Sequence, residues 1–149
     1  MKIAVGSDEA THLTSHVVAE LLRRGHELCL MGALAEGCDP SWPAVGRAVG
    51  QSVASGGCEQ GVVFCYTGTG VSIAANKTPG VRAALCTDAQ TADGARRWND
   101  ANVLAMSLRS TSPDEAVEIL DAWFSAPHGD ADDVRMIDML REMDPPRKG

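Results

Sequence analysis

The sequence is poor in aromatic side chains and has no excess of positive charge. Phe, Trp and Tyr make up 4% of its 149 residues, so aliphatic and alanine side chains must fill the core. The 13 Lys and Arg residues are outnumbered by 20 Asp and Glu residues, which gives a formal net charge of −7. This balance argues against a nucleic-acid partner and against binding to an anionic membrane surface. An anionic small molecule would need a local cluster of positive charge.

Paired cysteine motifs and long apolar runs are also missing. Five cysteines leave at least one unpaired, and none forms a C-x-x-C pair, so zinc and dithiol redox sites are not indicated. The apolar run at residues 1–6 is too short for a signal peptide or a membrane span. We therefore expect a cytoplasmic protein without a membrane partner.

Short apolar runs alternate with helical patterns along the chain. The length and the 44% hydrophobic content suit one compact domain over residues 1–149, with residues 130–149 as a C-terminal helix and tail. Strands are expected over residues 2–6, 26–31, 61–65, 81–86 and 102–106. Helices are expected over residues 11–24, 43–54, 88–97, 113–124 and 130–143, with Ser112 as an N-cap and a frayed tail from residue 144. This alternation predicts a parallel sheet covered on both faces, with ligands at the carboxyl ends of its strands.

The most informative segment begins at Cys65, where an expected strand runs into a glycine-rich turn. Glycines in such a turn let backbone N–H groups converge on a phosphate or a developing oxyanion. An ordinary structural turn is the alternative, and the spacing matches neither a Walker loop nor a dinucleotide fingerprint. The Cys65 thiol could act as a base beside these N–H dipoles, or it could be a buried core cysteine.

Residues 65–77, Cys-Tyr-Thr-Gly-Thr-Gly-Val-Ser-Ile-Ala-Ala-Asn-Lys, resemble the signature of the ribose-5-phosphate isomerase B / galactose-6-phosphate isomerase family. The similarity continues through residues 80–86, 99–105 and the opening residues 2–8. These segments occur in order and at family spacing, which makes the match more specific than any single motif.

The resemblance implies a fold, a reaction and an assembly. The fold would be a three-layer α/β/α Rossmann-like sandwich with a five-stranded parallel sheet. The reaction would be aldose–ketose isomerisation without metal or cofactor, in which a proton moves between C1 and C2 of an open-chain sugar through a cis-enediolate. The assembly would be a homodimer or homotetramer whose active sites lie between two subunits.

The same resemblance assigns roles to individual residues. Cys65 would be the base, since Val71 stands where some family members carry a glutamate. Asp8 would bind substrate hydroxyls, although it could instead cap the helix that begins near Thr11. The residues expected to stabilise the enediolate oxygens are Thr67, the amides of Gly68, Thr69 and Gly70, and Asn99, which could otherwise be only a turn residue.

The sequence departs from the family mainly at substrate-binding positions. The departures are Glu9 for the third residue of a Ser-Asp-His motif, Trp42-Pro43-Ala44 for Tyr-Pro-Asp, Thr87 and Trp98 for two histidines, and Arg135-Met136 for a pair of arginines. Glu9 would repel a phosphate dianion. Trp42 and Trp98 offer apolar surface that suits a sugar face, or they are core or dimer-interface residues.

Four arginines remain candidates for a rearranged anion site. They are Arg96, Arg97, Arg109 and Arg135, and each could instead be a surface charge or part of a structural ion pair. Taken together, the departures favour a substrate other than ribose 5-phosphate. A short acyclic sugar phosphate, or an unphosphorylated sugar, fits best. The alternative is a non-catalytic sugar-binding or regulatory member of the family.

Overall fold

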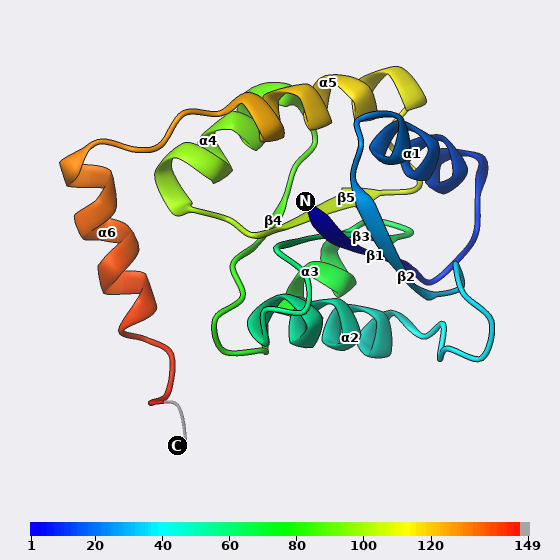
Figure 1. The fold of residues 1–149 in the computed structure, drawn as a ribbon, viewed down its shortest axis with the longest axis horizontal. Helices are drawn as coiled ribbons and strands as arrows, with labels where there is room; N and C mark the ends of the chain where they lie inside the picture. Colours follow the sequence, from blue (N-terminus) through cyan, green and yellow to red (C-terminus); the bar gives the residue numbers. More distant parts are fainter. Residues whose placement is uncertain (147–149) are drawn as a thin grey trace.

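The computed structural model of the protein describes residues 1–146, in which strands and helices alternate along the chain (Figure 1). The strands are β1 (Lys2–Ser7), β2 (Glu27–Gly32), β3 (Gln60–Cys65), β4 (Ala83–Leu85) and β5 (Val103–Ser107). The helices are α1 (His12–Arg23), α2 (Trp42–Ala54), α3 (Thr69–Asn76), α4 (Ala89–Asn99), α5 (Pro113–Ser125) and α6 (Ala131–Arg141).

The five strands form one parallel sheet in the order β2-β1-β3-β5-β4. Helices α1, α4 and α5 cover one face of this sheet, and α2 and α3 cover the other (Figure 1). The predicted three-layer sandwich with a five-stranded parallel sheet is therefore confirmed.

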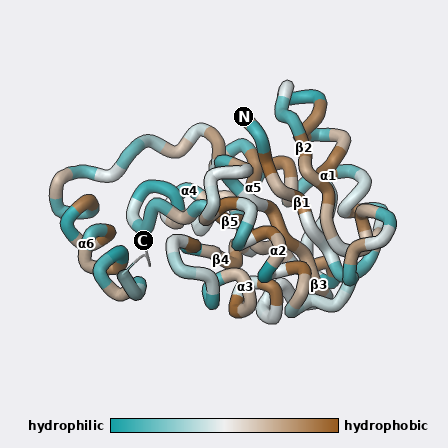
Figure 2. The backbone as a smooth tube through the Cα atoms, turned by 60° about the horizontal axis from the view of Figure 1, so that its bottom comes forward, coloured by the Kyte–Doolittle hydropathy of each residue, from teal (hydrophilic) through white to brown (hydrophobic). Residues whose placement is uncertain are grey.

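The core consists of two apolar clusters, one on each face of the sheet. The most hydrophobic stretches of the chain follow the strands (Figure 2). Aliphatic and alanine side chains supply most of both clusters, as the low aromatic content requires, and Phe64 and Trp123 are the large rings in the first. The second cluster depends on close helix packing, because a Cβ on Gly46 of α2 would come within 2.6 Å of the Ala74 side chain of α3.

The expected elements are all present, and their bounds shift by one or two residues at most ends. Ser112 is the N-cap of α5, as expected, and the structure adds a capping box between Ser112 and Glu115. The strand expected over residues 81–86 is shorter in the structure, where β4 covers only Ala83–Leu85. The Arg82 amide donates to the side-chain oxygen of Asn102 at 2.7 Å, so it forms no backbone hydrogen bond with the neighbouring strand.

The C-terminal helix also ends earlier than expected, at Arg141. The residues that follow it are partly held, since the Asp144 carboxylate accepts a hydrogen bond from the Gly80 amide at 2.8 Å. Residues 147–149 of the expected frayed tail lie outside the described part of the chain.

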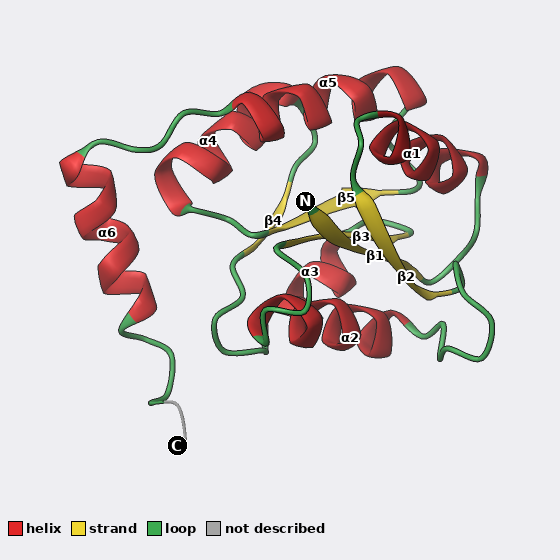
Figure 3. Cartoon of the chain, viewed as in Figure 1, coloured by secondary structure: helices red, strands yellow, loops and turns green. Residues whose placement is uncertain are grey.

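The carboxyl ends of the strands all meet at one edge of the sheet, because the strands are parallel (Figure 3). The loops after β1, β3, β4 and β5 lie at this edge, which we call the carboxyl edge. Helix α6 and the last turn of α4 lie at the opposite edge, on the left of the view. There Arg141 of α6 bridges to Asp100, just after α4, at 2.8 Å.

Candidate active site

Cys65 is the last residue of β3 and lies at the carboxyl edge with 5% of its surface exposed. Its carbonyl accepts a hydrogen bond from the Leu108 amide at 3.0 Å, so the loop after β5 holds its backbone. Cys86, beyond β4, is fully buried, and burial raises the pKa of its thiol to about 12. A group with that pKa stays protonated at neutral pH, so Cys86 is not suited to act as a base.

The loop after Cys65 turns directly into α3. Gly68 makes this possible with a φ of +79°, a conformation that other residues adopt only at a cost. The Thr67 and Thr69 hydroxyls lie 2.7 Å apart and hydrogen-bond to each other. Among the described residues, no acceptor pairs with the amides of Gly68, Thr69 and Gly70, so three donors at the start of a helix are left for a ligand.

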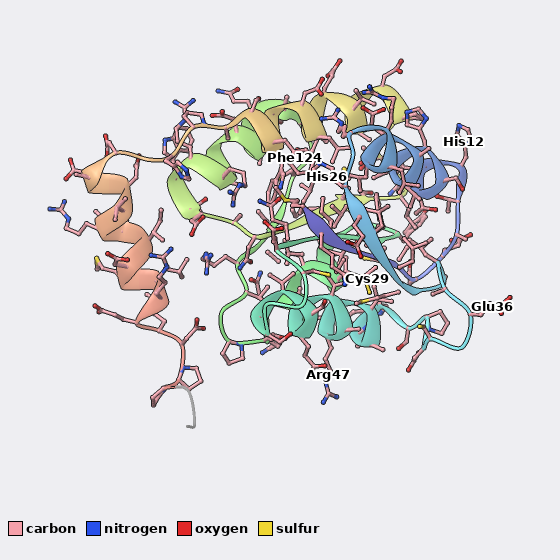
Figure 4. The ribbon with its side chains drawn as sticks, in the orientation of Figure 1. His12, His26, Cys29, Glu36, Arg47 and Phe124 are labelled. Atoms are coloured by element: carbon pink, nitrogen blue, oxygen red, sulfur yellow. The ribbon has the colours of Figure 1, made fainter. Side chains whose placement is uncertain are left out.

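Trp42, the first residue of α2, lies against this loop. A Cβ on Gly70 would come within 2.9 Å of the indole ring, so only glycine lets the ring approach so closely. Trp42 is 47% exposed, which excludes a core role. A groove of about 500 Å³ runs from Trp42 along Ile73 and Lys77, and Arg47 also lines it, projecting from α2 away from the sheet (Figure 4).

Asp8 and Glu9 follow β1 at the same edge. The Asp8 amide donates to the Phe64 carbonyl at 3.4 Å, which ties this loop to the strand that carries Cys65. One carboxylate oxygen of Asp8 is buried and has no hydrogen-bond partner among the described residues. Burial raises the pKa of Asp8, and the nearby Glu9 carboxylate adds to the rise. The alternative role of Asp8 as a cap is excluded, because Thr11 itself caps α1.

Thr87 lies at the carboxyl edge after β4 and is exposed. The neighbouring Asp88 carboxylate accepts a hydrogen bond from the Thr91 amide at 2.7 Å, which lowers the pKa of Asp88. The other predicted residue at this edge, Arg109, places its guanidinium 5.9 Å from the centre of the Tyr66 ring.

Trp98, Asn99 and Arg135 lie away from the carboxyl edge. Helix α4 runs back across the sheet, so its last residue, Asn99, lies near the start of β5, whereas Cys65 ends β3. The six residues of β3 span roughly 16 Å, at about 3.3 Å per residue. Within a single subunit, Asn99 and Cys65 therefore lie far apart.

These residues have other surroundings at that end of the molecule. Trp98 is 52% exposed, which excludes a core role, and its ring lies against Gly94. Trp98 and Asn99 line a groove of about 410 Å³ that also contains Thr91. Arg135 on α6 pairs with Asp132 at 3.2 Å.

Arg96 and Arg97 are held in structural ion pairs. Arg96 pairs with Asp100 at 3.5 Å and lies over the Trp123 ring, while Arg97 pairs with Asp93 at 3.2 Å. Of the four arginines considered for an anion site, only Arg109 has no carboxylate partner in the part of the chain that the structure describes.

Two residues beside the loop were not predicted from the sequence. Tyr66 lies within the family-like segment, but its position next to Cys65 indicates no role by itself. Its side chain is exposed and contacts Arg109. Ser107 is the last residue of β5, and its buried hydroxyl donates to the Tyr66 carbonyl at 2.9 Å. A serine at a strand end carries no signal in a single sequence, so only the register reveals it.

Comparison with known proteins identifies the family of the chain. Residues 3–140 match the family model described as Ribose/Galactose Isomerase. The chain belongs to this family. Ribose-5-phosphate isomerase B of Escherichia coli is 39% identical over 127 residues, which cover 84% of each chain. D-erythrulose-4-phosphate isomerase of Pectobacterium atrosepticum is 34% identical over 127 residues, covering 85% of this chain and 84% of the relative.

The fold of this isomerase family is also found in solved structures. Ribose-5-phosphate isomerase B of Clostridium thermocellum superposes with a TM-score of 0.88 at 37% identity, covering 96% of this chain and 97% of that one. No helix within residues 1–146 is long and apolar enough to cross a membrane. Those residues also contain no group of three or more His, Cys, Asp or Glu placed to hold a metal ion.

Proposed function

We propose that the chain is an aldose–ketose isomerase acting on a short sugar phosphate, with Cys65 as the base. The observation that carries the proposal is the junction of β3 and α3. Cys65 ends β3 only three residues before Gly68, the first of three consecutive residues whose amides lack acceptors within the described chain. A base next to preorganised donors is the arrangement that enediolate chemistry needs.

The proposed reaction divides its work among the residues of the carboxyl edge. Cys65 removes the proton from C2 of the aldose and returns it to C1, while the hydroxyl proton passes from O2 to O1 within the cis-enediolate. The amides of the loop and the Thr67 hydroxyl stabilise the negative oxygens of the cis-enediolate. Asp8 accepts a hydrogen bond from a substrate hydroxyl, which would satisfy its unpartnered carboxylate oxygen. The non-catalytic alternative is not favoured, because the residues proposed for this chemistry are retained and the relatives are named as enzymes.

The proposed site is completed by a second copy of the chain. Asn99 and Cys65 lie at opposite edges of the sheet, so an Asn99 that donates to the enediolate must come from a partner subunit. Helix α6 supports this arrangement, because Val134, Met136, Met139 and Leu140 leave much of its apolar surface exposed. Light scattering should report two or four times the chain mass of 15.7 kDa.

Subunit mixing tests the shared site directly. Cys65→Ala and Asn99→Ala homo-oligomers, each inactive, should regain roughly a quarter of wild-type activity after mixed refolding, since half of the random dimers contain one intact site. Mixing Cys65→Ala with Thr67→Ala is the matched control. Both lesions lie on the same edge, so no pairing restores a site. Equal recovery in both mixtures, or none in either, would contradict the shared-site arrangement.

The proposed substrate is acyclic. Thr87 stands where the family has a histidine, and a threonine hydroxyl does not exchange protons near neutrality, so the usual acid–base group for ring opening is missing. A sugar phosphate with four carbons and a phosphate on O4 cannot close a furanose ring, and one relative is named for such a compound. Glu9 is exposed, so solvent and salt screen its repulsion of a phosphate.

The free thiol state of all five cysteines fits a reducing compartment, in line with the expected cytoplasmic location.

A substrate panel tests this choice. Tetroses, pentoses and hexoses, each with and without phosphate, should be assayed together with deuterium incorporation from solvent, which the enediolate route requires. Ribose 5-phosphate should be turned over at least about 10²-fold less efficiently than the best acyclic substrate. Thr87→His combined with Glu9→His should recover part of that activity. A wild-type kcat/KM for ribose 5-phosphate near ~10⁴ M⁻¹s⁻¹ or above would refute the proposal.

A further inference from the structure

The hydroxyl of Ser107 connects two loops at the carboxyl edge. It donates to the Tyr66 carbonyl at 2.9 Å and accepts from the Ser110 amide at 3.1 Å. Ser107 is also the register partner of Cys65 in the neighbouring strand, so the two side chains project from the same face of the sheet. The residue is buried, so its hydroxyl has little access to solvent as an alternative partner.

The loop after β5 holds both carbonyls that precede the amide loop. The Leu108 amide donates to the Cys65 carbonyl at 3.0 Å, and the Arg109 amide donates to the Tyr66 carbonyl at 3.0 Å. The Tyr66 carbonyl therefore accepts two hydrogen bonds, and one of them comes from a side chain. In a planar trans peptide the carbonyl and the N–H point in opposite directions. Fixing the Tyr66 carbonyl toward β5 therefore fixes the direction in which the Thr67 amide points.

We infer that Ser107 is a positioning residue for the reaction proposed above. It does not contact the substrate. It sets the peptide plane between Tyr66 and Thr67, and through that plane the placement of the Cys65 thiol and the Thr67 hydroxyl. A small misplacement of catalytic groups costs much more in turnover than in substrate binding, because the enediolate interactions exist only along the reaction path. This inference rests on the proposed function, but its structural part can be measured without a substrate.

The test compares Ser107→Ala, Ser107→Thr and the matched control Ser110→Ala. The control lies in the same loop, and its side chain forms no hydrogen bond with the described residues. Kinetics on the best substrate of the panel give kcat and KM. Amide hydrogen exchange of Leu108 and Arg109, followed by NMR, reports how firmly the loop holds the Cys65 and Tyr66 carbonyls, with the β1 amides as an internal reference.

Ser107→Ala should lower kcat roughly tenfold with KM within about twofold, and should speed exchange at Leu108 and Arg109 roughly fivefold. Ser107→Thr, which keeps the hydroxyl, should remain within about threefold of wild type in both measurements, and Ser110→Ala should change neither. Unchanged exchange in Ser107→Ala overturns the inference, as does an equal loss in Ser110→Ala. So does a rise in KM alone, which would mean that the hydroxyl binds substrate. If the wild type isomerises no sugar, the proposed function fails, and the exchange rates still decide whether Ser107 holds the loop.

Discussion

Replacing Gly68 by Ala should reveal two free-energy costs that glycine avoids, the cost of a positive φ and the cost of a steric clash. Gly68 has a φ of +79°, and a Cβ there would lie 2.9 Å from the backbone carbonyl carbon of Met106. Gly56 has a similar φ of +80°, but a Cβ there would meet nothing within 4 Å, so Gly56→Ala measures the conformational cost alone. That cost is about 1–2 kcal/mol. The clash at Gly68 cannot be relieved by a side-chain rotation, so we expect a further cost of about 1–3 kcal/mol, or about 2–5 kcal/mol in all.

Urea unfolding of both variants and the wild type gives the two free energies. Protein concentration must be held constant, since the stability of an oligomer depends on it. Relief of the clash also moves the amides of the loop, so Gly68→Ala should lose on the order of 10²-fold in turnover while Gly56→Ala stays close to wild type. If the two variants agree within about 0.5 kcal/mol and both remain active, the packing of the loop against β5 is not as described.

Three further predictions concern single side chains. Cys65→Ala and Cys65→Ser should lower turnover roughly 10²–10⁴-fold. Cys58 is a buried cysteine of the same core cluster, so the control Cys58→Ala should affect stability only. A fully active Cys65→Ala variant would refute the mechanism. Asp8→Asn should be more stable than wild type at pH 7, because the folded state raises the pKa of Asp8 and so disfavours its carboxylate. In thermal melts this gain in stability should vanish below pH 3.8, the pKa of Asp8 in the unfolded chain, because protonated Asp8 and the replacing Asn are both neutral there. A gain that persists below that pH would show that the raised pKa of Asp8 is not its cause. Burial and the Met1 amino group lower the pKa of His26 in the folded state. The free energy of unfolding should therefore fall as the pH drops from 6.5 through that lowered pKa. His26→Phe should flatten this pH dependence in thermal melts from pH 7 to 5.

The His26 prediction has a simple structural basis. The imidazole stacks on Phe124 of α5 at 4.8 Å between ring centres (Figure 4). Phenylalanine should keep that stacking and remove the titration, so the variant separates the charge from the packing. An unchanged pH slope would assign the acid sensitivity to another group.

The sequence was sufficient to predict the fold because local signals agree with one another. Apolar runs of strand length alternate with helical periodicity, and caps such as Ser112 mark helix ends. The errors are at boundaries that tertiary contacts decide. Val81 and Arg82 have a strand-like pattern, but the Asn102 side chain takes the Arg82 amide, an interaction between residues far apart in sequence.

The candidate site was predictable in part. Cys65 and its glycine loop are contiguous, so their proximity is visible in the sequence. The separation of Asn99 from Cys65 is not visible, because it depends on helix α4 crossing the full length of the sheet. Ser107 and Tyr66 were missed for a related reason. Their roles arise from the neighbouring positions of β3 and β5, which are 42 residues apart in register at Cys65 and Ser107.

The placement of the three tryptophans offers a spectroscopic consequence. Trp42 and Trp98 each place the indole ring against a glycine and leave about half of their surface in water, whereas Trp123 is buried and its indole N–H donates to Gln60 at 2.8 Å. The intrinsic fluorescence should therefore contain a red-shifted component from the two exposed indoles and a blue-shifted one from the core. A sugar or a partner subunit that covers Trp42 or Trp98 would change the first component, and unfolding would change the second. One unlabelled sample can then report ligand binding and folding separately.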